Sequence, residues 1–600
     1  MLRCDVAKTD KWSIEDIYED DAAWQSDYDC FADELNKGLQ YRGRLADSAQ
    51  TLLDAIKIYD ELDEKAEKIY VYAYMRLYED MSDAASQGMA QKAQSLVVKF
   101  ASEYSFIEPE ILAIDENILR GWMNGNLGHY THMIEDILLE KPHTLSADKE
   151  QLLAQASVMQ SAPKDIFSQF NNSDIRFADI TDENGKSASL TNGVYGRFME
   201  SSDRRVRKEA FESLYREYAG HINMLAAAYT ANLKQAGFYA GVRNYGSSLE
   251  MYLSQNNIPV NVYTNLIDTV NRRMELMHRY VRLRKRALGV DELHMYDVYA
   301  PMVPDYSMKV GYDEAKEMVL EGMRPLGEHY GRILREGFDG GWIDVRENQG
   351  KRSGAYSWGE YGTHPYVSLN YSDRLDDVFT LAHEMGHAIH TYHSNKKQPH
   401  VYAGYRIFVA EVASTCNEVL LMRSLLEKCT DNRERKYLLN HFLEQFKGTL
   451  FRQTMFAEFE MQTHEVLRNG EALGAQDICN IYRKLNEKYF GSDMVLDKQI
   501  EYEWARIPHF YTPFYVYQYA TGFSAAIAIA RSLIDGYKKG DDSAREGYFR
   551  FLSGGSSMHP IELLKLCGID MTSPAPVEAA LDVFEELLDE FKNGIWYGSR

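Results

Sequence analysis

Proline, cysteine and long apolar runs are all scarce in this chain of 600 residues, and each shortage excludes a class of protein. With only 14 prolines, long stretches contain nothing that would interrupt a helix. The six cysteines are scattered without a CxxC pair, so we expect free thiols rather than a disulfide framework or a cysteine metal site. No stretch approaches the ~18 consecutive apolar residues of a transmembrane helix, and residues 1–20 do not read as a signal peptide. We therefore expect a cytoplasmic protein.

Positive charge is also in short supply. Lysine and arginine together number 66 against 90 aspartates and glutamates, which gives a net charge of −24. Sequence-independent binding to nucleic acid or to anionic membranes needs a basic face, so neither partner is expected. The hydrophobic fraction of 45% and the charged fraction of 26% are those of an ordinary globular protein. A chain of this length exceeds one simple core, so we expect two or more lobes or one large composite domain.

Apolar residues recur every three or four positions over long stretches, as at Leu439, Phe442, Phe446 and Leu450. This spacing places them on one face of an α-helix. The pattern therefore predicts a mainly α fold.

Two segments depart from the helical pattern. Residues 174–193 alternate apolar and polar side chains around an Asn-Gly pair, which predicts a β-hairpin. Residues 341–372 are rich in β-branched and aromatic side chains punctuated by glycine, and they predict a small sheet that leads into the next helix. We expect a helical N-terminal region over residues 1–200, which includes the hairpin, and a larger region over 201–600 that carries the sheet and the functional site.

The segment TLAHEMGHAIHTYH, residues 380–393, contains the pattern HExxH. On a helix, residues four apart lie nearly above one another, so the imidazoles of His383 and His387 can reach one ion. Zinc accepts neutral imidazole nitrogen and tolerates an open position for water. Glu384 is rotated by about 100° around the helix from His383, where its carboxylate can accept a proton from that water without binding the ion. A Lewis acid and a general base together can catalyse the hydrolysis of an amide bond.

Gly386 lies inside this helix. Glycine costs about 1 kcal/mol relative to alanine in a helix interior. We therefore expect close packing against Gly386, and the preceding sheet is the candidate neighbour.

A catalytic zinc needs a third protein ligand, and two residues compete for this role. His393 completes the spacing HExxHxxHxxH, which differs by one residue from the metzincin pattern HExxHxxGxxH. In that pattern the glycine turns the chain so that the last histidine returns to the metal. Here His390 replaces the glycine and none follows until Gly404, so a continuing helix would carry His393 away from the ion.

The second candidate is Glu411, which lies 24 residues after His387 in an otherwise apolar helical segment. A glutamate on a second helix that crosses the first is the gluzincin arrangement, and it makes Glu411 the better third ligand than His393. The competing interpretation of Glu411 is a solvated surface charge. Glu418 lies two turns further along the same face, where it can hydrogen-bond a ligand imidazole. We expect His390 and His393 to be helix-surface or substrate-cleft residues.

The segments VFTLAHEMGHAIHTY and FVAEVASTCNE resemble those of oligoendopeptidase F, within the thimet oligopeptidase and neurolysin superfamily of zinc metallopeptidases. The resemblance extends over about residues 140–570 and includes the segments EKPHTLSADKEQLLA, TNGVYGRFMESSDRRVRKEAFESLY, KRSGAYSWGEYGTHPYVSLNY and HFYTPFYVYQYATG. It implies an elongated, multi-helical, two-lobed molecule with a deep channel and zinc on the channel floor. It also implies activity on short unstructured peptides, which alone can enter such a channel.

The same resemblance implies that a histidine and tyrosines of a late loop bind substrate and stabilise the tetrahedral intermediate. Here that loop starts at His509, and it is shorter and less glycine-rich than in thimet oligopeptidase. We expect Tyr517 to donate a hydrogen bond to the oxyanion together with His509, and Tyr511 and Tyr515 are the next candidates. A separate expectation concerns the stretch Gly354-Ala355-Tyr356, whose backbone could pair as an edge strand with an extended peptide substrate.

The sequence thus predicts a zinc-dependent endopeptidase, with one Zn²⁺ per chain, that cuts internal bonds of short oligopeptides. An exopeptidase of the same superfamily that removes C-terminal dipeptides is one alternative. A peptide-binding protein that has lost catalysis is the other.

Overall fold

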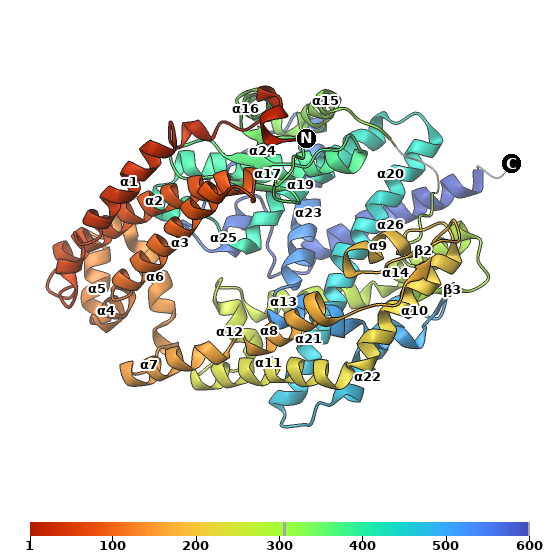
Figure 1. The fold of residues 1–600 in the computed structure, drawn as a ribbon, viewed down its shortest axis with the longest axis horizontal. Coiled ribbons are helices and arrows are strands. Elements are labelled where there is room, and N and C mark those ends of the chain that lie inside the picture. The colour runs from red at the N-terminus through yellow and green to blue at the C-terminus, as the bar shows by residue number, and fades with distance from the viewer. Residues whose placement is uncertain (304–307, 598–600) are drawn as a thin grey trace. The chain divides into compact units, whose positions relative to one another are not determined.

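The computed structural model describes residues 1–303 and 308–597, and it is mainly helical with only small sheets (Figure 1). The prediction of a mainly α fold is confirmed. Among the described helices, none combines the length and the apolar character that crossing a bilayer requires.

The chain divides into two compact units, and each unit gathers three stretches of sequence. Unit 1 comprises Met1–Pro142, Ser307–Ser424 and Ile529–Gly568. Unit 2 comprises His143–Tyr306, Leu425–Ala528 and Ile569–Arg600. The division at residue 200, the two-lobed shape and the deep channel stay predictions.

Unit 1 is built on a group of N-terminal helices around an apolar core that includes Trp24, Leu52 and Phe100. Polar caps start two of these helices: the side chain of Ser48 accepts a hydrogen bond from the backbone of Thr51, and Asp83 caps the next helix in the same way. The helices of unit 1 are α1 (Asp21–Glu34), α2 (Ala49–Glu79), α3 (Ala84–Tyr104), α4 (Ile107–Ala113), α5 (Glu116–Met123), α6 (Thr131–Leu139), α15 (Tyr312–Gly322), α16 (Gly327–Asp339), α17 (Leu375–Lys397), α18 (His400–Ala403), α19 (Ile407–Lys428, to Ser424), α24 (Ser543–Leu552) and α25 (Pro560–Lys565).

Unit 2 is also helical, and it contains the predicted hairpin region. There β1 (Ile180–Thr181) pairs antiparallel with β2 (Ser187–Ala188), and Gly185 adopts the positive φ that the turn requires. The strands β3 (Leu293–His294) and β7 (Met494–Val495) pair in parallel. The helices are α7 (Ala147–Ala156), α8 (Ala162–Gln169), α9 (Asn192–Met199), α10 (Arg204–Gly220), α11 (Ile222–Val242), α12 (Ser248–Ser254), α13 (Val260–Arg272), α14 (Met274–Leu288), α20 (Asn432–Gln445), α21 (Arg452–Arg468), α22 (Ala475–Phe490), α23 (Tyr517–Lys539, to Ala528) and α26 (Ala575–Tyr597).

A three-stranded sheet in unit 1 precedes α17, as the sequence predicts. Its order is β4 (Ile343–Asp344), β6 (Tyr366–Ser368), β5 (Tyr356–Trp358). The central strand β6 is fully buried and runs parallel to β4 and antiparallel to β5. The strand β5 therefore lies at an edge of the sheet, and it packs against α17.

Helix α17 presents an apolar stripe to the interior of unit 1 and crosses α19 at very short range. A Cβ atom added to Gly386 would lie 2.5 Å from Cα of Ser414 in α19. Nearby, the side-chain amide of Asn417 donates a hydrogen bond of 3.0 Å to the carbonyl of Ala382. The expectation that the sheet packs on Gly386 is wrong, because the close neighbour is the backbone of α19.

This crossing yields a prediction for Gly386→Ala. The added methyl group meets backbone rather than a flexible side chain, so the two helices must separate, at a cost of about 1–3 kcal/mol. Both stability and metal affinity should fall, as measured by chemical denaturation and by metal titration. Gly88→Ala in α3 is the matched control: nothing lies within 4 Å of its added Cβ, so stability should stay equal or rise by up to about 1 kcal/mol. Equal stability of the two variants would contradict the proposed crossing.

Candidate functional site

His383 and His387 on α17 and Glu411 on α19 converge in unit 1. Nε2 of His383 lies 3.4 Å from Oε2 of Glu411, and Nε2 of His387 lies 3.7 Å from the same oxygen. The ligand atoms of the three residues all lie within 4.8 Å of one another. Ligand atoms of a tetrahedral zinc with bonds of about 2.0–2.1 Å are roughly 3.3 Å apart. The donor set, two imidazole nitrogens and a carboxylate oxygen, therefore fits one zinc ion with small adjustments.

The protonation states of two of these residues also suit metal binding. Burial, followed by the neighbouring His383, lowers the pKa of His387 to about 4, so its imidazole is neutral at pH 7. The hydrogen bond with His383 lowers the pKa of Glu411, which keeps that carboxylate ionised. Neutral imidazole and ionised carboxylate are the forms that bind zinc.

Glu418 orients the first imidazole. It lies two turns beyond Glu411 on α19, and its Oε1 accepts a hydrogen bond of 2.6 Å from Nδ1 of His383. Burial alone would lower the pKa of His383, but Glu411 and Glu418 raise that pKa well above its usual value. A carboxylate on the far nitrogen fixes the tautomer and directs Nε2 toward the ion.

Glu384 lies on α17 next to His383 and does not belong to the group formed by His383, His387 and Glu411. Only 7% of its surface is exposed, and Oε2 has no hydrogen-bond partner within the described residues. Burial raises the pKa of Glu384 to about 7, whereas the neighbouring His383 and a hydrogen bond from the backbone of Ser357 in β5 lower it. A buried carboxylate that can take up a proton near neutral pH is suited to general-base chemistry, and a nearby cation would lower its pKa.

The other two histidines of the helix are interior packing residues. His390 is 1% exposed and its ring stacks on Tyr405 at 3.8 Å, while His393 packs between His329 and Phe549. Burial lowers the pKa of His390 to about 3 and that of His393 to about 4. The expectation that they lie on the helix surface or in a substrate cleft is wrong, because neighbouring helices and Tyr405 cover them.

A second group of possible metal ligands lies elsewhere in unit 1, at His132, Asp136 and His559. Oδ1 of Asp136 is 3.9 Å from Nε2 of His132 and 3.5 Å from Nδ1 of His559. Its other oxygen accepts a hydrogen bond from Arg406 at 2.9 Å. A guanidinium beside the ligand carboxylate repels a cation, so the group on α17 and α19 is the better metal site.

The structure places the predicted substrate strand beside α17. Gly354 and Ala355 precede β5 and line a cavity of about 210 Å³ together with Thr380 of α17. Tyr356, the first residue of the edge strand, packs its ring against Trp12. One side of β5 has no partner strand within the described residues.

The predicted late-loop residues belong to unit 2. His509 lies beside Tyr515 and Tyr519, and the hydroxyl of Tyr519 is 3.4 Å from its Nε2. The sequence motifs assign no role to Tyr519. Its position next to His509 makes it a further candidate residue of this loop. Tyr511 stacks on Phe167, and Tyr517 is almost completely buried with its ring against Tyr263. The roles of His509, Tyr511, Tyr515 and Tyr517 stay predictions.

Comparisons with known proteins agree with this geometry. The model of peptidase family M3 matches residues 197–583, and the oligopeptidase F model matches residues 110–177. The chain belongs to peptidase family M3 and is a metallopeptidase. It is similar to oligopeptidase PepF of Bacillus subtilis (strain 168), at 46% identity over 592 residues that cover 98% of this chain and 88% of that protein.

Two further relatives span nearly the full length. Group B oligopeptidase PepB of Streptococcus agalactiae serotype III (strain NEM316) is 40% identical over 593 residues, with 98% of each chain covered. The crystal structure of oligoendopeptidase-F from Enterococcus faecium matches with a TM-score of 0.74 and 38% identity, covering 96% of this chain and 99% of that chain. The resemblance inferred from the sequence motifs is confirmed.

The choice of third ligand leads to a direct prediction. Glu411→Ala removes one of three ligand atoms and should abolish stoichiometric metal binding after dialysis, whereas His393→Gln should retain one metal per chain. Elemental analysis of both purified variants gives the metal content, and thermal melting verifies that each is folded. Loss of metal from His393→Gln but not from Glu411→Ala would show that His393 is the third ligand.

Proposed function

We propose that the chain is a zinc-dependent endopeptidase that hydrolyses internal peptide bonds of short, unstructured oligopeptides. The observation that carries this proposal is the buried carboxylate of Glu384 next to a converging set of two imidazoles and one carboxylate. The names of the relatives, oligopeptidase and oligoendopeptidase, support oligopeptides as the substrate class. The strongly negative net charge and the lack of a membrane-spanning helix among the described residues support a cytoplasmic enzyme that binds neither nucleic acid nor membranes.

Each side chain then has a defined task. His383, His387 and Glu411 would hold zinc, which when bound supplies a Lewis acid that polarises the peptide carbonyl and acidifies water. Glu384 accepts a proton from the attacking water and later donates it to the nitrogen of the leaving amine. The backbone of Ser357 orients the Glu384 carboxylate through its hydrogen bond.

Backbone pairing and side-chain hydrogen bonds have separate tasks toward the substrate. The free edge of β5, with Gly354 and Ala355 before it, pairs with the extended peptide by main-chain hydrogen bonds. His509 and Tyr517 stabilise the oxyanion, and Tyr511 and Tyr515 contact the substrate. Main-chain pairing uses hydrogen bonds to the substrate backbone and not to its side chains, which suits an enzyme that cleaves many sequences.

The general-base assignment predicts the behaviour of Glu384→Gln. This variant keeps the ligand set but cannot take up the proton, so turnover should fall by about 10²–10⁴-fold while one zinc per chain remains bound. The assay is cleavage of an internally quenched fluorescent peptide, with zinc measured on the same sample. Glu328→Gln on the exposed start of α16 is the matched control and should cleave at the wild-type rate. Cleavage by Glu384→Gln at more than about a third of the wild-type rate would rule out the mechanism.

The endopeptidase assignment predicts that a peptide blocked at both ends is still cleaved. A peptide acetylated at its N-terminus and amidated at its C-terminus should be cut at an internal bond, because main-chain pairing along β5 needs no free terminus. Mass spectrometry of the products identifies the bond. An enzyme that releases only C-terminal dipeptides, and only from peptides with a free carboxylate, would be an exopeptidase instead.

A further inference from the structure

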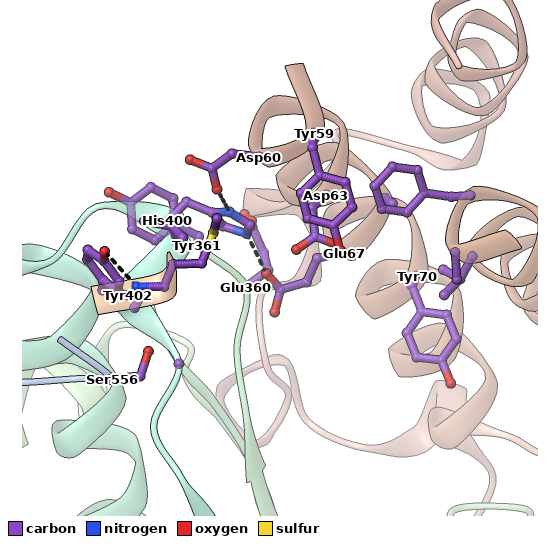
Figure 2. A pocket seen from close by; sticks show the side chains of 18 of the residues that line it. Tyr59, Asp60, Asp63, Glu67, Tyr70, Glu360, Tyr361, His400, Tyr402 and Ser556 are labelled. Carbon is purple, nitrogen blue, oxygen red and sulfur yellow. Dashed lines mark hydrogen bonds and ion pairs between the residues drawn. The ribbon is translucent and has the colours of Figure 1, made fainter. Parts of the chain in front are cut away.

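A cavity of about 1110 Å³ in unit 1 begins next to the candidate active site (Figure 2). Ser357, whose backbone bonds Glu384, lines it, and so does Thr391, one helical turn beyond His387. Tyr405 also lines the cavity, and burial with the charges of Glu411 and Glu384 raises the pKa of its phenol to about 12. Trp358, the last residue of β5, also lines the cavity, so this edge strand ends at the cavity wall.

The cavity wall carries more negative than positive charge. His400 pairs with Asp60 at 2.8 Å and with Glu67 at 3.4 Å, as Figure 2 shows. Burial alone would lower the pKa of His400, but these two carboxylates raise it to about 10, so it is a cation at pH 7. Arg406 pairs with Asp136, and burial lowers the pKa of His132, which is neutral. Against these two cations stand six carboxylates, from Asp60, Asp63, Glu67, Glu108, Asp136 and Glu360.

Glu360 is the residue of the wall best placed to bind a cationic group. The residue is 3% exposed, it lines the cavity, and its Oε2 has no hydrogen-bond partner among the described residues. The charge of Lys68 lowers the pKa of Glu360, but its ammonium lies over the ring of Tyr18 at 4.6 Å and forms no ion pair with Glu360 among the described residues. A buried carboxylate oxygen without a partner costs free energy unless a donor from outside the chain supplies the hydrogen bond.

Asp63 on α2 is the second carboxylate of the wall without an ion pair in the described part of the chain. Burial raises its pKa, and the charge of His400 offsets this only in part. Both Glu360 and Asp63 therefore gain from a positive group that enters the cavity.

Aromatic rings form part of the remaining wall. A guanidinium or ammonium group can lie over such rings while its aliphatic stem packs against them. A bare metal ion suits the part of the cavity at Glu360 less well: among the described residues, no group of ligand atoms within 4.8 Å includes the carboxylates of Asp60, Asp63, Glu67 or Glu360. The converging group that does touch the cavity wall, at His132 and Asp136, has the guanidinium of Arg406 beside its carboxylate. The aromatic lining residues include Tyr59, Tyr70, Phe100, Tyr104, Trp358 and Tyr361.

We propose that this cavity is a specificity subsite that binds the side chain of an arginine or lysine of the peptide substrate, with Glu360 and Asp63 as its anionic partners. The inference rests on the proposed function, because the cationic side chain belongs to the peptide that is cleaved. It adds a preference for cationic peptides to an enzyme whose main-chain contacts are otherwise indifferent to sequence.

Binding to the inactive Glu384→Gln protein tests the subsite separately from catalysis. The probes are fluorescent peptides blocked at both ends, in which one arginine is moved through each position in turn and compared with citrulline, its neutral isostere. At one or two positions, arginine should bind at least about tenfold more tightly than citrulline, because citrulline lacks the positive charge that strengthens hydrogen bonds to carboxylates. Equal affinities at every position, or no binding of any peptide, would overturn the proposal.

Variants of the cavity wall make the test specific. Adding Glu360→Gln and Asp63→Asn to Glu384→Gln should reduce the preference for arginine to less than about threefold, whereas adding Glu328→Gln should leave it unchanged. Asp63→Asn alone should at least halve the preference, which keeps the test decisive if Glu360→Gln fails to fold. A preference that survives all of these changes would place the cation elsewhere and overturn the assignment.

Two further arms separate the remaining possibilities. If a free N-terminal ammonium improves binding more than arginine does at any position, the subsite reads the peptide terminus, and the side-chain proposal fails. Cleavage of the arginine and citrulline peptides by the wild-type enzyme gives kcat/KM for each pair. Preferential binding without any cleavage would support the subsite while refuting the proposed function, and cleavage with no preference would do the reverse.

Discussion

The close crossing of α17 and α19 is the constraint on which the rest of the site depends. Because Gly386 has no side chain, the backbone at Ser414 approaches α17 directly, and Asn417 ties the two helices together through a buried hydrogen bond. At this separation, Glu411 and Glu418 on one face of α19 both reach the imidazoles of α17. One small residue in a helix interior, unfavourable on its own, thereby sets the distance between ligand atoms that belong to different helices.

Buried carboxylates with an oxygen that lacks a hydrogen-bond partner are the second important feature of unit 1. Glu384 and Glu360 each have an oxygen with no partner among the described residues, and burial raises the pKa of each to about 7. Such groups cost stability, and they occur where function needs them. Glu384 lies where a proton must move, and Glu360 lines the cavity that begins beside it. The backbone of Ser357 in β5 bonds the first of these carboxylates, and Trp358 next to it lines the cavity of the second.

The sequence predicted the helical fold and the small sheet, because both depend on local periodicity and turn residues. It proposed the zinc ligands from spacing along α17 and from one charge in an apolar helix. It could not predict contacts between distant segments: the neighbour of Gly386 is α19 and not the sheet, and His390 and His393 are covered by other elements. The cavity that joins Asp63 of α2 to Glu360 after β5 has no motif, because its residues lie about 300 positions apart in the sequence.

The central claim is that His383, His387 and Glu411 hold one zinc ion while Glu384 stays free to move a proton. A crystal structure of the zinc-loaded protein, with anomalous scattering measured at the zinc edge, tests this most directly. We expect a single strong peak with two imidazole nitrogens and one carboxylate oxygen at about 2.0–2.2 Å, and Glu384 outside that distance. A peak bound by His393 or by Glu384 in place of Glu411, or found only at His132, Asp136 and His559, would contradict the claim.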